Sequence, residues 1–106
     1  MTNNTEDNRK LFFTQAEVVE IGELTKAILR GFSGTFTISQ ESHIYKSFCI
    51  KLECEYSDKE HSLVYPFSES EGNQLAKGQF IRHISQKLGL NMLYYLRKQD
   101  EDTSKS

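Results

Sequence analysis

Residues 48–56 alternate between large apolar side chains and mostly charged ones, and this constrains the fold more than any other feature of the sequence. Successive side chains of a strand point to opposite faces, so this pattern places the apolar set on one face and the polar set on the other. The apolar set is Phe48, Ile50, Leu52, Cys54 and Tyr56, and the positions between them are Cys49, Lys51, Glu53 and Glu55. One buried face and one wet face favour an antiparallel sheet, so we predict a strand of that kind over 48–56.

Two shorter segments have the same period of two and extend the predicted sheet. Residues 35–39 alternate threonine or serine with apolar side chains, and in residues 61–67 Leu63, Tyr65 and Phe67 fall on one side. The polar stretches 40–43 and 57–60 are typical of turns between strands. Pro66 is the only proline and lacks an N–H donor, which suits an edge strand or a strand end.

A helix is predicted before these strands, over residues 15–30. Thr14 and Glu17 have the spacing of a capping box, and Gly31 is a suitable C-terminal stop. The apolar stripe recurs at steps of three and four residues and consists of Val18, Ile21, Leu24 and Ile28. Acidic residues lie early and basic residues late in this segment, which suits the helix dipole.

A second helix is predicted after the strands. Ser68 and Glu71 repeat the capping-box spacing, and we expect Gly89 to end the helix. Its apolar stripe is Phe80, Ile81, Ile84 and Leu88. Residues 90–96 fit either a fourth strand or a further helical turn. We favour the strand because Gly89 interrupts the helical pattern and adjacent tyrosines favour sheets.

These elements predict an α+β fold of order α-β-β-β-α, with an optional fourth strand at 90–96. The apolar faces imply a small antiparallel sheet with two helices on one face. The chain has 106 residues, which fits a single domain, and we place that domain at 11–98. Residues 1–10 and the acidic tail 99–106 carry little to bury and are expected to be disordered.

The cysteines and the N-terminus favour a cytoplasmic protein. Cys49 and Cys54 point to opposite faces of the predicted strand, so they cannot pair with each other. Two free thiols are typical of a reducing compartment, and Cys49 is expected on the exposed face. The polar N-terminal residues lack the apolar stretch of a signal peptide, and no apolar run is long enough to cross a bilayer, so no membrane partner is expected.

No residue pattern indicates catalysis or a bound cofactor. His43, His61 and His83 are interpreted as surface histidines, and neither histidine nor cysteine spacing fits a metal site. Glu53 and Glu55 share a strand face, where paired carboxylates are far more often solvated than catalytic. A hydrolase built on His61 and Glu53 is the least favoured alternative. We therefore expect no enzymatic activity, no cofactor and no metal.

Charge is distributed unevenly along a chain whose net charge is only −2. Residues 53–71 carry six acids against one lysine, whereas residues 77–98 carry basic residues and no acid. Basic side chains contact phosphates, and aromatic rings stack on nucleobases or anchor protein interfaces. Basic residues late in a helix can also serve only to complement the helix dipole. The candidate partner-binding residues are Tyr94, Tyr95, Arg97, Lys98, Arg82 and Lys87.

The element order over 15–88 resembles that of double-stranded RNA-binding domains, which implies a nucleic-acid partner. Members of that family carry a glycine-flanked lysine cluster where the second helix begins. Here residues 69–73 read Glu-Ser-Glu-Gly-Asn, which would repel phosphate.

The sequence as a whole favours a binding role over catalysis. We predict a non-enzymatic protein-binding module that acts as a small adaptor or inhibitor, with self-association through a sheet edge or the second helix as an option. The alternative is a nucleic-acid-binding domain that uses Arg82, Lys87, Arg97 and Lys98.

Overall fold

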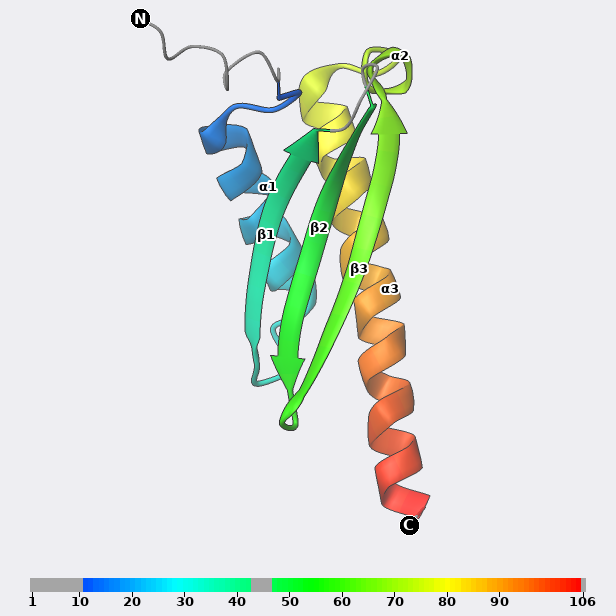
Figure 1. The fold of residues 1–106 in the computed structure, drawn as a ribbon. Coiled ribbons are helices and arrows are strands. Elements are labelled where there is room, and N and C mark those ends of the chain that lie inside the picture. Colours follow the sequence, from blue (N-terminus) through cyan, green and yellow to red (C-terminus); the bar gives the residue numbers. More distant parts are fainter. Residues whose placement is uncertain (1–10, 43–46, 106) are drawn as a thin grey trace, which may run out of the picture.

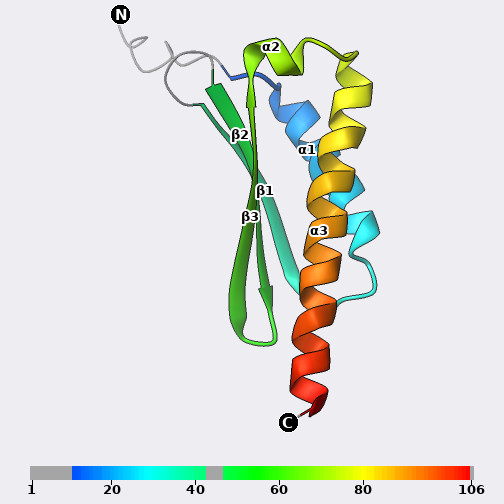
Figure 2. The same ribbon diagram turned by 90° about the vertical axis from the view of Figure 1, so that its right-hand side faces the viewer.

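The computed structural model describes residues 11–42 and 47–105, with side chains described as far as residue 100. The elements in chain order are α1 (Gln15–Ile28), β1 (Thr35–Ser42), β2 (Ser47–Tyr56), β3 (Lys59–Ser68), α2 (Glu69–Gly72) and α3 (Lys77–Lys105). The strands form one antiparallel sheet in the order β1-β2-β3, and α1 and α3 cover the same face of it (Figures 1 and 2). The predicted α+β fold and its element order are therefore confirmed.

Strand β2 has the predicted alternation and forms the centre of the core. Ile50 and Leu52 are fully buried, whereas Glu53 and Glu55 lie exposed on the sheet face that no helix covers. Cys49 departs from the prediction, because it faces the uncovered side and is nevertheless only 6% exposed. Its neighbours across the sheet are Glu41 and Pro66, and the Cys49 thiol donates a hydrogen bond to Glu41 Oε1 at 3.7 Å.

The connection between β2 and β3 is tighter than the sequence suggested, and β1 is longer. A two-residue turn joins β2 to β3, and both of its residues, Ser57 and Asp58, have positive φ angles of 56° and 62°. A turn whose two central residues both have left-handed backbone conformations matches the twist of the two strands that it joins. β1 extends to Ser42, so most of the predicted turn at 40–43 is strand instead. His43 lies outside the described residues, as do residues 1–10.

Helix α1 begins as predicted and ends two residues early. Thr14 is the N-cap: its hydroxyl accepts from the Glu17 N–H, and the Glu17 carboxylate accepts from the Thr14 N–H. The last helical residue is Ile28 rather than Arg30.

The predicted second helix is two helices, and its C-terminal half differs most from expectation. The capping box at Ser68 begins only the single turn α2, and α3 begins at Lys77. Gly89 does not end α3, so the fourth strand favoured for 90–96 is wrong, and the helix runs through Lys105, across most of the tail expected to be disordered. No helix in the described part of the chain is long and apolar enough to span a membrane.

Gly89 serves helix packing rather than helix termination. A Cβ at Gly89 would lie 2.7 Å from Ile28 Cδ1 and 3.1 Å from Ile28 Cβ. α3 therefore approaches α1 closely at this point because Gly89 has no side chain. The apolar stripe continues past Gly89 with the same period, and Met92 and Leu96 are fully buried.

Candidate functional site

The exposed side of α3, opposite its buried stripe, carries the strongest candidate surface. The buried stripe consists of Phe80, Ile81, Ile84, Leu88, Met92 and Leu96. Residues three, four, seven and eight apart share one side of a helix, so five exposed residues between 87 and 98 gather on the side opposite the stripe. We call these five the α3 patch: Lys87, Leu90, Tyr94, Arg97 and Lys98. Asn91 and Tyr95 are also exposed but are not counted in it.

Two apolar side chains form the centre of the α3 patch. Leu90 is 55% exposed and Tyr94 is 68% exposed, although both are large. They are four residues apart, so they lie one above the other on the helix surface. The Lys98 ammonium lies 5.9 Å from the centroid of the Tyr94 ring, within range of a cation–π interaction. The patch is therefore an apolar pair with cations around it.

The helix continues past this patch and beyond the end of the sheet. Figure 1 shows that the last turns of α3 extend past the turn between β2 and β3. Tyr56, at the end of β2, anchors this extension: its hydroxyl donates to the Asp100 carboxylate at 3.0 and 3.1 Å. That hydrogen bond, followed by burial, raises the pKa of Tyr56. The contact fixes the patch relative to the sheet.

Four of the six predicted residues lie in the α3 patch, and two do not. Tyr95 is turned toward β3, where its ring packs edge-on against His61 with centroids 5.0 Å apart. Arg82 is sixteen residues before Lys98, which corresponds to about 24 Å along the helix. Leu90 was missed because residues 90–96 were read as a strand. In a helix, its four-residue spacing from Tyr94 places both side chains on the same side.

His61 is buried rather than a surface histidine. It lies directly across from Cys54 in the sheet, and both side chains face the helices. Burial raises the pKa of the Cys54 thiol, which keeps the thiol protonated and unreactive at neutral pH. His83 is exposed, as predicted, and its ring lies 5.8 Å from the Tyr65 ring.

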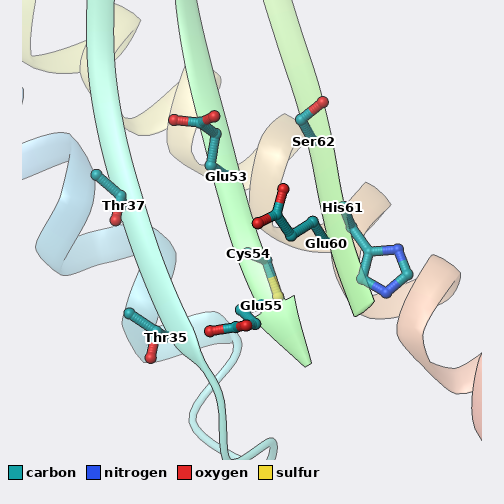
Figure 3. Close-up of a pocket in the computed structure, with 8 residues that line it drawn as sticks. All are labelled: Thr35, Thr37, Glu53, Cys54, Glu55, Glu60, His61 and Ser62. Carbon is teal, nitrogen blue, oxygen red and sulfur yellow. The ribbon is translucent and has the colours of Figure 1, made fainter. Parts of the chain in front are cut away.

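The uncovered sheet face carries a second, acidic feature. Figure 3 shows a shallow hollow at one end of this face, where Glu53, Glu55 and Glu60 project from β2 and β3 beside Thr35 and Thr37 of β1. Within the described residues, no three acidic, histidine or cysteine side chains are placed to hold a metal ion. The acidic hollow and the α3 patch lie on opposite layers, so the molecule has two surfaces of opposite charge.

The start of α3 does not resemble a phosphate-binding site. Lys77 is held within the molecule: its ammonium donates to the Phe12 carbonyl at 3.2 Å and lies 3.8 Å from a Glu17 oxygen. The preceding α2 carries two acids, Glu69 and Glu71, in its single turn. The position where the resemblance to double-stranded RNA-binding domains implies a lysine cluster therefore carries two acids and an engaged lysine, which are not favourable for phosphate.

No family model, no curated protein and no solved structure matches this chain.

Proposed function

We propose that this chain is a non-enzymatic protein-binding module, a small adaptor or inhibitor, that presents the α3 patch to an acidic surface on a partner protein. The observation that carries the proposal is the exposure of Leu90 and Tyr94, at 55% and 68%, on a helix that has no acidic residue between 77 and 98.

The composition of the α3 patch suits protein recognition. Interface energy concentrates in a few central side chains, among which tyrosine is enriched, while surrounding groups exclude water. Tyr94 and Leu90 supply such a centre. Lys87, Arg97 and Lys98 supply a charged rim, which steers an acidic partner and raises the association rate.

Both cysteines support a binding role in a reducing compartment. Neither Cys49 nor Cys54 forms a disulfide, and burial is the main cause that raises the pKa of each thiol. A catalytic cysteine needs a lowered pKa and access to substrate, and these thiols have the opposite environment. We therefore place the protein in the cytoplasm.

The test is a pull-down from native extract, with and without nuclease. The bait proteins are the wild type, Leu90→Glu and Val64→Glu. Val64 of β3 is a matched control because it is also apolar and, like Leu90, 55% exposed. We expect a nuclease-resistant protein that binds the wild type and Val64→Glu but not Leu90→Glu. The proposal is overturned if Leu90→Glu retains the same partner, or if the isolated protein turns over a substrate.

A nucleic-acid partner is the second candidate, and the absence of acids on α3 between 77 and 98 favours it. Tyr94 beside Lys98 could also stack on a base while the ammonium contacts phosphate. Binding of RNA or DNA whose affinity falls steeply with salt, and which Lys98→Glu abolishes, would support this candidate. We rank it second because the acids of α2 and of the uncovered sheet face would repel a long polyanion.

A further inference from the structure

The outer edge of β1 is open to another strand. β1 pairs only with β2 among the described strands, so the N–H and C=O groups along its other edge meet no strand. β1 is eight residues long, contains no proline, and has one charged residue, Glu41, near its end. The opposite edge strand, β3, contains Pro66, which cannot donate a ladder hydrogen bond. Edge strands without proline or inward-pointing charge are templates for strand addition.

A groove of about 330 Å³ runs beside this edge, between α1 and β1. Its apolar part is formed by Val18, Val19 and Gly22 of α1 and by Phe36 and Ile38 of β1. Gln15, Glu23, Lys26 and Thr37 also line it, so the groove is mixed rather than purely apolar. Val19 is 52% exposed, and the two β1 side chains are only partly buried. A strand that paired with β1 would place every second side chain over the apolar part of this groove.

The charge on the uncovered sheet face indicates what the other side chains of the added strand would be. Glu55 lies directly across from Thr35, and Glu53, whose carboxylate lies 3.6 Å from the Lys51 ammonium, lies directly across from Thr37. An added strand would lie on the far side of these threonines, about 10 Å from the β2 backbone, given strand spacings near 4.8 Å. A lysine or arginine side chain at that position could extend over the threonines toward the two carboxylates. The third carboxylate, Glu60, adds to the negative potential of this face.

We propose that the β1 edge and the α1–β1 groove form a second binding site, which takes an extended segment of another protein by strand addition. The segment alternates apolar side chains, which enter the groove, with basic side chains, which face Glu53 and Glu55. A second copy of this chain fits less well. Its own β1 would bring threonine, serine and Glu41 to the acidic face, and no basic residue. The site is separate from the α3 patch, so it does not depend on the function proposed for that patch.

The experiment measures binding of fluorescein-labelled ten-residue peptides to the full chain by anisotropy. The probe alternates valine with lysine and is used below the concentration at which it self-associates. Two comparison peptides have glutamate in place of lysine, or the same residues with the lysines grouped together. We expect each comparison peptide to bind at least tenfold more weakly than the probe. Val19→Glu should weaken the probe at least tenfold, and Leu90→Glu should leave it unchanged.

Backbone N-methylation tests the strand pairing itself. One version of the probe is methylated at the valines and another at the lysines. Only one set of amides can face β1, so only one version should lose binding, and the bound probe should slow amide exchange in β1. The proposal is overturned by equal binding of both methylated versions, or by a loss of binding in Leu90→Glu instead of Val19→Glu. It is also overturned if sedimentation shows a dimer that Val19→Glu separates into monomers, because the edge would then be occupied by a second copy.

Discussion

Gly89 lies against Ile28 where α3 crosses α1, and a Cβ at Gly89 would be 2.7 Å from Ile28 Cδ1. Helix propensity alone predicts that a larger residue at position 89 would stabilise the helix by up to about 1 kcal/mol. The contact predicts the opposite. We expect Gly89→Leu to lower the free energy of unfolding by about 1–3 kcal/mol, as overpacking does elsewhere.

The control for this prediction is Gly78→Ala, near the start of the same helix, where an added Cβ would meet nothing within 4 Å. We expect that change to be neutral or stabilising. Urea denaturation of Gly89→Leu, Ile28→Ala and the double variant measures the coupling between positions 89 and 28. The interpretation fails if Gly89→Leu lowers the free energy of unfolding by as much in the Ile28→Ala background as in the wild type.

Tyr56→Phe should loosen the last turns of α3 without unfolding the domain. Only the phenolic hydroxyl is removed, so the hydrogen bonds to Asp100 at 3.0 and 3.1 Å are lost while the ring remains. We expect amide exchange in residues 97–105 to accelerate several-fold while exchange in β2 stays unchanged. Equal acceleration in both segments would contradict the anchoring role.

Alkaline pH should destabilise the fold in a way that depends on particular residues. Burial raises the pKa of Cys49 and of Cys54 above the ordinary thiol value of 9.0. The pKa values of Tyr56 and Tyr65 are likewise raised above the ordinary phenol value of 10.0. In this range the folded state retains protons that the unfolded state loses, so stability falls as the pH rises from about 9. Urea midpoints between pH 7 and 10.5 measure the effect. The slope should be shallower in Cys54→Ala, and an unchanged slope would show that this thiol does not contribute.

Binding at the α3 patch should separate into an apolar and an electrostatic part. Tyr94→Ala should weaken a partner roughly 30-fold, or about 2 kcal/mol, mainly through faster dissociation. Removing both charges with Arg97→Gln and Lys98→Gln should instead slow association and reduce its dependence on salt. Surface plasmon resonance at 50 and 300 mM salt distinguishes the two effects. Lys51→Gln, on the uncovered sheet face, is the control and should bind as the wild type does.

The sequence predicted the parts of the fold in which local chemistry and tertiary packing agree. The capping box at Thr14 and the alternation of 48–56 each specify one structure, because their spacing fits no other period. Gly89 was misread because a glycine after an apolar stripe is equally suited to ending a helix and to a close helix crossing. The regular recurrence of Met92 and Leu96 after Leu88 is the signal that favours the crossing.

The candidate site was predicted in part, for a similar reason. Basic residues on α3 could be recognised from charge alone, but the choice between Tyr94 and Tyr95 depends on the helix, which turns about 100° between them. Burial of Cys49 and His61 depends on neighbours from other elements, Glu41 and Pro66 for Cys49 and Tyr95 for His61. Nothing in the local sequence around Cys49 or His61 indicates these contacts.

The close crossing at Gly89 also determines the geometry between the two proposed binding surfaces. The groove belongs to α1 and β1, and the α3 patch belongs to α3, so the crossing joins their supporting helices into one rigid body. Two ligands bound at these surfaces would be held at a constant distance and angle to each other. A single protein that carried both recognition segments would gain avidity only if its linker spanned that distance.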